Sequence, residues 1–249
     1  MKILIAGYCG HMGQEVARLA KEGYRGAELT AGVDINATGN EPVPCSVTFE
    51  NAVCAVDCIV DFSHHSCTHD LLTFAKKNHL PVVLATTGQT PEEIEEIRAS
   101  AKEIPVFFSA NMSLGVALLV ELAKKTAAAM PDAEIEIIEQ HHDRKLDAPS
   151  GTALMLANGI KEVRPESFAV TGRNGHGKRT PEEIGIHAIR MGNIVGIHEV
   201  IVGTQTQTIT LKHEAHSRSL FAEGAMVAAA FLVKQGPGLY TMKDTIAQN

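Results

Sequence analysis

The sequence lacks several features that mark particular classes of protein. It has no excess of positive charge, since 22 Lys and Arg stand against 29 Asp and Glu, and the net charge of −7 argues against nucleic acid as the main partner. Its longest apolar run with helical spacing, residues 114–130, contains Glu121, Lys124 and Lys125, so no membrane span is expected. The N-terminus, MKILIAG, leads directly into a glycine-rich loop and shows no signal-peptide cleavage region.

Cysteine is scarce and unevenly placed. All five cysteines fall in the first third of the chain: Cys9, Cys45, Cys54, Cys58 and Cys67. An odd number, no C-x-x-C pair and no secretory signal together predict reduced thiols in the cytoplasm. Residues 64–69 (HHSCTH) are rich in histidine, but their spacing matches no common zinc pattern, so no metal is expected.

The rest of the composition is that of an ordinary globular protein. Of the 249 residues, 45% are apolar and 20% are charged. This length allows one large domain or two modest ones with a substantial core. Because the chain as a whole is negative, an anionic substrate would need a local positive site.

The first 34 residues contain a strand, a glycine-rich loop, a helix and a second strand, in that order. Lys2–Ala6 is a near-continuous apolar run, typical of a strand buried on both faces. GYCGHMG follows at residues 7–13, then a helix over residues 14–22 and a strand at Glu28–Val33 that ends at Asp34. Glycines let a pyrophosphate approach a helix N-terminus, and an acidic residue after the second strand accepts hydrogen bonds from the adenosine ribose. This order of elements predicts dinucleotide binding. The glycine spacing alone, G-x-x-G-x-x-G, is not specific for it. The alternative is that the glycines form a purely structural turn.

Strands and helices continue to alternate up to residue 112. Strands are predicted at residues 56–62, 81–87 and 105–109, with helices at 66–78 and 91–102 between them. This alternation predicts a doubly wound parallel sheet, in which ligands bind beyond the carboxyl ends of the strands. The segments at those ends also fit ordinary loops; they are residues 62–63, 85–87 and 109–112.

The character of the chain changes after a predicted long helix at residues 113–130. Three β-rich segments follow at hairpin-like spacing, at residues 184–190, 194–203 and 207–213. With a strand at residues 133–138 they predict a smaller α+β domain that has a mostly antiparallel, four-stranded sheet. A basic loop at residues 172–179 either closes over substrate or is simply solvated. A helix at residues 217–233 is expected to return the chain to the first domain.

The segment EQHHDRKLDAPSGTA, residues 139–153, is the most informative part of the chain. It places four cationic or titratable side chains just before a predicted helix: His141, His142, Arg144 and Lys145. Ser150 is a good N-cap for that helix, whose N–H groups and positive dipole end favour an anion. The segment therefore predicts a carboxylate pocket with proton donors beside it, and a polar loop with solvated charges is the alternative.

Seven segments occur in the order seen in the dihydrodipicolinate reductase (4-hydroxy-tetrahydrodipicolinate reductase) family. They are GYCGHMG, the strand ending at Asp34, ATTG, SANMSLGV, EQHHDRKLDAPSGTA, HEAHSR and GLYTMKD, so the sequence resembles that family over essentially its whole length. The resemblance implies a Rossmann-type dinucleotide-binding domain at residues 1–112 and 218–249, and a substrate-binding and tetramerisation domain at 113–217. It also implies a homotetramer that reduces a small dicarboxylate of lysine and diaminopimelate synthesis with NADH or NADPH.

The resemblance also implies roles for individual residues. The proton donor falls on His141, the catalytic lysine on Lys145, and the substrate contacts on His142, Gly151 and Thr152. The cofactor contacts fall on the glycine loop and the strand ends: Gly7, Tyr8, Cys9, Gly10, His11, Met12, Asp34, Ala85, Thr86, Thr87, Ser109, Ala110, Asn111 and Met112. The sequence leaves open which of His141 and Lys145 delivers the proton.

The residue after Asp34 bears on the choice of cofactor. It is Ile35, whereas members of the resembled family that prefer NADPH often carry arginine there. A 2′-phosphate would bring like charge against Asp34, and Ile35 cannot offset that repulsion. We therefore expect NADH to be used at least as well as NADPH.

Two other functions fit parts of the sequence. One is another two-domain reductase, such as a homoserine or semialdehyde dehydrogenase; the latter needs a nucleophilic cysteine, and none lies beyond Cys67. The other is a non-catalytic NAD(P)-sensing protein, which would need neither His141 nor Lys145.

Overall fold

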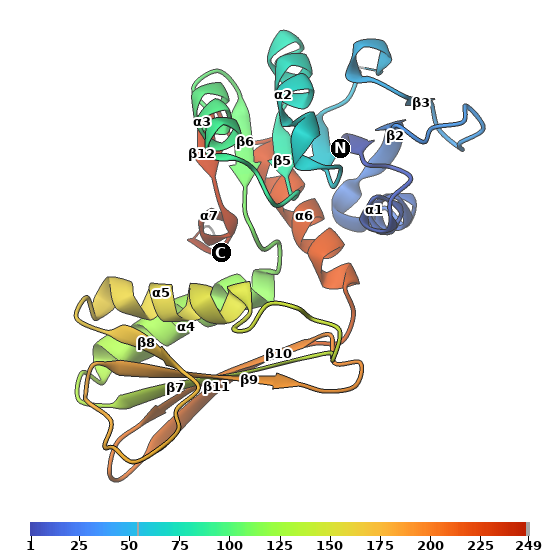
Figure 1. Cartoon of the computed structure of the whole chain (residues 1–249). Coiled ribbons are helices and arrows are strands. Elements are labelled where there is room, and N and C mark those ends of the chain that lie inside the picture. The colour runs from blue at the N-terminus through green and yellow to red at the C-terminus, as the bar shows by residue number, and fades with distance from the viewer. Residues whose placement is uncertain (54, 248–249) are drawn as a thin grey trace. The chain divides into compact units, whose positions relative to one another are not determined.

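A computed structural model describes residues 1–53 and 55–247 of the chain (Figure 1). The chain divides into two compact units, one formed by Met1–Leu114 with Ser219–Asn249 and the other by Gly115–Arg218. Cys54 lies outside the described residues, and Cys9, Cys45, Cys58 and Cys67 are free thiols. None of the described helices is long and apolar enough to cross a membrane.

The first unit contains a seven-stranded sheet in which every pairing is parallel. Its strands are β1 (Lys2–Ala6), β2 (Glu28–Val33), β3 (Cys45–Ser46), β4 (Cys58–Asp61), β5 (Val82–Leu84), β6 (Pro105–Phe108) and β12 (Gly238–Tyr240). They are ordered β12-β6-β5-β4-β1-β2-β3. The chain therefore leaves β1 towards β2 on one side and reaches β4 on the other, which makes the carboxyl end of β1 the topological switch point where ligands bind.

Helices cover this sheet. They are α1 (His11–Lys21), α2 (Thr68–Lys77), α3 (Pro91–Ser100), α6 (Ser219–Leu232) and α7 (Met242–Ala247), with 3₁₀ turns η1 (Tyr24–Gly26), η2 (Phe49–Asn51) and η3 (His65–Cys67). Leu71 and Leu72 of α2 and Ile97 of α3 pack with strand residues in one core, while α6 packs against α1 and β4–β6. Because both faces are covered, consecutive strand residues such as Ile3–Ile5 are fully buried.

The second unit contains a five-stranded mixed sheet with α4 (Leu114–Ala129) and α5 (Gly151–Val163) on one face (Figure 1). Its strands are β7 (Glu134–His141), β8 (Phe168–Thr171), β9 (Glu183–Arg190), β10 (Gly196–Gly203) and β11 (Thr208–Ala215), ordered β11-β10-β7-β9-β8. Ile135 and Ile137 of β7 pack with Leu119 of α4 and Ile160 of α5 in its core.

The predicted fold class, a Rossmann-type parallel sheet plus a smaller α+β unit, is confirmed, but the second sheet differs from expectation. It has five strands rather than four, and β7–β9 and β8–β9 are parallel pairs. β9 and β10 do not form a hairpin, because β7 lies between them. The connecting segment crosses the end of β7, where Met191 N donates to His141 O and His142 N donates to Ile194 O, at 2.9 and 2.8 Å. β8, which was not predicted, is a short and mostly exposed edge strand.

Candidate active site

The last residues of β7 place a carboxylate and an imidazole in the layer that faces the helices. Along this strand Ile135, Ile137, Glu139 and His141 alternate on the buried face, so Glu139 and His141 follow two core isoleucines. Glu139 is 0% exposed and His141 is 8% exposed. A buried carboxylate is costly unless it is paired and hydrogen-bonded, so the partners of Glu139 define this site.

Glu139 has partners from three segments. Its Oε2 lies 2.6 Å from His141 Nδ1, and its Oε1 accepts a hydrogen bond from Ser150 N at 3.0 Å. The guanidinium of Arg190, at the end of β9, donates from Nη1 to Oε2 at 2.9 Å and from Nη2 to Oε1 at 2.6 Å. This two-bond contact is the strong, planar form of an arginine–carboxylate pair.

These contacts set the protonation of the cluster. Burial opposes ionisation of Glu139, but hydrogen bonds from Arg190, His141 and Ser150 outweigh it, so the pKa of Glu139 is below its ordinary value. Burial lowers the pKa of His141, and Glu139 opposes that shift. His198, whose ring packs edge-on against His141 with centroids 5.1 Å apart, has its pKa lowered to about 4 by burial and then by the charge of His141. His198 is therefore neutral at pH 7.

The start of α5 lies beside this cluster. The Ser150 hydroxyl accepts from Ala153 N at 3.3 Å, which caps the helix, and it also lies 3.1 Å from His198 Nε2. Gly151 and Thr152 form the first helical residues, where backbone N–H groups point out of the helix and attract anions. The predicted anion site is thus fixed to the cluster through Ser150.

The loop between β7 and α5 carries the remaining predicted residues. Lys145 Nζ pairs with Asp147 Oδ1 at 2.8 Å, and the charge of Lys145 helps to lower the pKa of His141. His142 is partly buried, and its Nδ1 has no hydrogen-bond partner among the described residues. Arg144 is largely exposed and pairs with Asp143 and with Asn193, so it is not part of the buried cluster.

In the first unit the glycine loop packs tightly on its neighbours. Gly7 has φ +75°, and a Cβ there would lie 2.6 Å from Phe62 O, so only glycine fits between β1 and the end of β4. A Cβ on Gly13 would lie 2.1 Å from Gly7 O. Because Gly13 has no Cβ, α1 can start close to the loop. This close approach of backbone is what a dinucleotide phosphate site requires.

A cavity of about 420 Å³ opens beside this loop. Four of the predicted cofactor residues line it: Gly7, Cys9, Gly10 and Asp34. The Asp34 carboxylate accepts from Cys9 N at 2.9 Å and from Asn36 N at 2.8 Å, which fixes it at the end of β2. Ile35, 77% exposed, and His64 also line the cavity, and no Lys or Arg is among the described residues of its lining.

The other predicted cofactor residues do not line this cavity. The Tyr8 side chain is buried, His11 begins α1, and Met112 is buried with its carbonyl against Gly224 of α6. The segments 85–87 and 109–112 follow β5 and β6 at the same end of the sheet as the glycine loop. There the Ser109 hydroxyl donates to Asn111 O at 2.8 Å.

Sequence reasoning missed a buried carboxyl at the end of β4. Asp61, 2% exposed, accepts from the Thr86 hydroxyl at 2.7 Å and from Ser63 N at 3.0 Å. Burial raises its pKa, against the opposing hydrogen bonds from Ser63 and Thr86. Asp61 therefore joins the segment after β4 to the predicted cofactor residue Thr86 after β5.

The histidine-rich segment 64–69 contacts α3. His65 Nδ1 lies 3.1 Å from both carboxylate oxygens of Glu93, and His69 Nδ1 lies 2.8 Å from Glu96. Over the part of the chain that the structure describes, no three His, Cys, Asp or Glu side chains are grouped so as to hold a metal ion.

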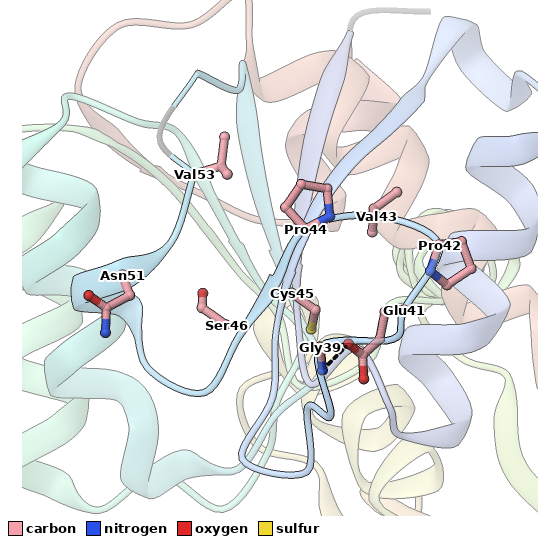
Figure 2. A pocket seen from close by; sticks show the side chains of 9 residues that line it. All are labelled: Gly39, Glu41, Pro42, Val43, Pro44, Cys45, Ser46, Asn51 and Val53. Carbon is pink, nitrogen blue, oxygen red and sulfur yellow. Dashed lines mark hydrogen bonds between the residues drawn. The ribbon is translucent and has the colours of Figure 1, made fainter.

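A second cavity, about 400 Å³, lies at the β3 edge of the same sheet (Figure 2). Its one carboxylate, Glu41, already accepts hydrogen bonds from Gly39 N at 2.9 Å and Thr38 N at 2.7 Å. Cys45 also lines it, and burial raises the pKa of that thiol to about 11, so it is not a nucleophile at neutral pH. Among the described residues, the lining offers no arrangement of groups that suits catalysis.

Glu139, Arg190 and His198 were also given no role in the predicted site, and Ser150 was predicted only as the N-cap of the helix. The alternation of β7 contained a signal for Glu139, because it falls on the apolar face of the strand. Arg190 and His198 lie about fifty residues further along the chain, and no local pattern connects them to His141.

Comparison with known proteins gives a consistent assignment. Sequence models of the N-terminus and C-terminus of dihydrodipicolinate reductase match residues 1–112 and 115–246. A 4-hydroxy-tetrahydrodipicolinate reductase of Caldanaerobacter subterraneus subsp. tengcongensis is 46% identical over 248 residues, covering 99% of this chain and 98% of that protein. One of Alkaliphilus oremlandii is 44% identical, with 99% and 98% coverage. A solved structure, a dipicolinate-bound dihydrodipicolinate reductase from Paenisporosarcina sp. TG-14, is 27% identical with a TM-score of 0.80 and covers 97% of both chains. The chain belongs to the dihydrodipicolinate reductase family.

Proposed function

We propose that this chain is an NAD(P)H-dependent oxidoreductase that reduces 4-hydroxy-tetrahydrodipicolinate to tetrahydrodipicolinate, a step of lysine and diaminopimelate biosynthesis. The observation that carries this proposal is the buried cluster of Glu139, His141 and Arg190 beside the N-terminus of α5, in a chain that matches the family over residues 1–112 and 115–246. A sensor protein would have no need of such a cluster.

The first unit is the proposed dinucleotide-binding domain. The cavity beside Gly7 and Gly10 suits a pyrophosphate at the start of α1, and Asp34 suits the adenosine ribose. The residues after β5 and β6, 85–87 and 109–112, are proposed to hold the nicotinamide half. Bound NADH or NADPH supplies the hydride.

The second unit is the proposed substrate-binding and tetramerisation domain. One substrate carboxylate is proposed to bind the N–H groups of Gly151 and Thr152 at the start of α5, with Lys145 and His142 adding positive charge or donors. His141 is the proposed proton donor, since Glu139 occupies its Nδ1 and leaves Nε2 for the substrate. Lys145 is the second candidate donor.

The proposed cofactor preference favours NADH, or equal use of both. Asp34 and Ile35 both line the cavity, and the part of the lining that the structure describes contains no Lys or Arg that would balance a 2′-phosphate. His64 lines the cavity and offers a hydrogen bond when neutral. The expected preference for NADH is at most ~10-fold, equivalent to about 1.4 kcal/mol.

The proposed assembly is a homotetramer in the cytoplasm. The face of the second sheet opposite α4 and α5 has no helix from this unit among the described residues (Figure 1). Ile138, Ile197 and Ile201 alternate with core residues and so lie on that face. Light scattering at micromolar concentration that gives a stable species of 26.7 kDa would contradict this assembly.

The activity is tested with purified protein and the substrate generated in situ, following oxidation of NADH and of NADPH. The proposal predicts oxidation that depends on the substrate. Turnover with a semialdehyde but not with this substrate would favour another two-domain reductase, and cofactor binding without any turnover would favour a sensor.

A further inference from the structure

Building on the proposed function, we infer that Glu139 is a positioning residue that fixes both the proton donor His141 and the helix start that receives the substrate carboxylate. Its two oxygens face different parts of the site. Oε2 holds His141 Nδ1 at 2.6 Å, and Oε1 holds Ser150 N at 3.0 Å. Ser150 is the residue that caps α5. One side chain therefore sets the position of both groups.

Arg190 keeps this carboxylate ionised and in place. Its Nη1 and Nη2 each bond one oxygen of Glu139, and the same guanidinium donates to Asp147 O at 2.7 Å and to Ile189 O at 2.8 Å. In the parallel pairing of β7 with β9, Arg190 lies directly opposite His141. Two backbone carbonyls thus hold the guanidinium in place beside the carboxylate, which leaves Glu139 little freedom to move.

An ionised Glu139 determines which nitrogen of His141 carries the proton. A carboxylate can only accept, so Nδ1 must be the donor at 2.6 Å and Nε2 is the nitrogen that exchanges a proton with substrate. Gly196 leaves space at that nitrogen, since a Cβ there would lie 3.2 Å from His141 Nε2. The carboxylate also stabilises the imidazolium form, which an acid catalyst must populate before it donates.

The positively charged groups around His141 disfavour its imidazolium form. Lys145 and Arg190 both lower the pKa of His141, and His198 packs against its ring. His198 is neutral at pH 7, since its pKa is about 4, and His213 lies next to His198 with its own pKa lowered by burial. Glu139 is therefore the group that favours protonation of His141.

Glutamine at this position tests the inference because it has nearly the same shape and the wrong hydrogen-bonding groups. Glu139 accepts four hydrogen bonds, from His141, Ser150 and the two nitrogens of Arg190. The amide has one accepting oxygen, and its NH₂ group would face a donor. Glu139→Gln is thus expected to lose the imidazolium-stabilising contact while keeping the volume of the side chain.

The matched control is Glu136→Gln. Glu136 lies on the same strand but on its other face, and it likewise pairs with a histidine, His187 Nε2 at 2.8 Å, and with an arginine, Arg179 Nη1 at 2.9 Å. Steady-state rates are measured against pH for wild type and both variants, with NADH affinity measured separately by titration.

For Glu139→Gln we expect kcat to fall by about 10²-fold near neutral pH, with NADH affinity unchanged. The limb on which activity falls with rising pH should move to lower pH by about one unit, since loss of a neighbouring opposite charge lowers the pKa of His141. In Glu136→Gln this limb should stay in place. A folded Glu139→Gln protein with wild-type kcat and an unmoved limb overturns the inference.

Nitrogen NMR of the wild-type histidines provides an independent test that needs no turnover and no stable variant. The neutral form of His141 should carry its proton on Nδ1, and a proton on Nε2 overturns the inference. If wild-type protein shows no activity with either cofactor, the proposed function fails, whereas this NMR result still decides the role of Glu139.

Discussion

Arg190→Leu is predicted to destabilise the second unit by leaving the Glu139 carboxylate buried without its strongest partner. Glu139 is 0% exposed, and Arg190 supplies two of its four hydrogen bonds. Removing one partner of a buried ion pair costs about 3–5 kcal/mol. We expect the free energy of unfolding to fall by about 3 kcal/mol, the lower end of this range, because His141 and Ser150 N still bond the carboxylate.

The size of this loss should depend on pH. In the wild type the pKa of Glu139 is lowered on folding, so the stability that it contributes is present at neutral pH and is lost as pH falls through the folded pKa. In Arg190→Leu fewer hydrogen bonds offset the burial of the Glu139 carboxylate, so the pKa of Glu139 should rise above its value in the unfolded chain. The folded variant then binds a proton that the unfolded chain does not, so its deficit relative to wild type should shrink between about pH 7.5 and about pH 5.5.

Urea unfolding followed by circular dichroism at both pH values measures this effect, and suits a chain that contains no tryptophan. Arg144→Leu is the control, since Arg144 carries the same charge in the neighbouring loop but is 65% exposed. The free energy of unfolding of this control is expected to lie within about 0.5 kcal/mol of the wild-type value. A loss of less than about 1 kcal/mol in Arg190→Leu, or an equal loss at both pH values, would refute the reasoning.

Four further substitutions test the proposed donors, the cofactor preference and the glycine loop. His141→Ala and Lys145→Ala should each reduce turnover by roughly 10²-fold or more in steady-state assays while NADH binding is little changed; near-normal turnover in both would mean that this loop is wrongly assigned. Ile35→Arg should raise kcat/KM with NADPH relative to NADH, because it supplies the positive charge that the cavity lining lacks; an unchanged ratio would show that another group sets the preference. Gly7→Ala should destabilise the first unit by about 1–3 kcal/mol from the positive φ alone, and it should weaken NADH binding in titrations because the added Cβ meets Phe62 O; wild-type stability would contradict the loop geometry.

Local sequence patterns accounted for most of the first unit. Strands β1 and β2 occur at the residues predicted, because apolar runs between turn signals are local information. Helix α1 starts at His11 rather than at residue 14, with Gly13 inside it. Glycine is a poor helix former, so propensity argued against this start, whereas packing requires it because a Cβ on Gly13 would meet Gly7 O.

The second sheet and the centre of the site depended on contacts between distant residues. The parallel pairing of β7 with β9 joins segments about fifty residues apart, and hairpin-like spacing suggested another partner for β9. The same pairing brings Arg190 to Glu139 and His141. Sequence motifs therefore sufficed to propose a proton donor and an anion site, while the contacts of Glu139 and Arg190 with them became apparent only in the folded chain.

Transfer of deuterium from the cofactor to the product tests the central claim most directly. NADH deuterated at its transferable position is incubated with wild-type protein and substrate generated in situ, and the product is analysed by mass spectrometry. The account predicts tetrahydrodipicolinate that carries a single deuterium, formed in step with NADH oxidation. Oxidation of NADH without deuterium in tetrahydrodipicolinate, or no oxidation with either cofactor, would contradict it.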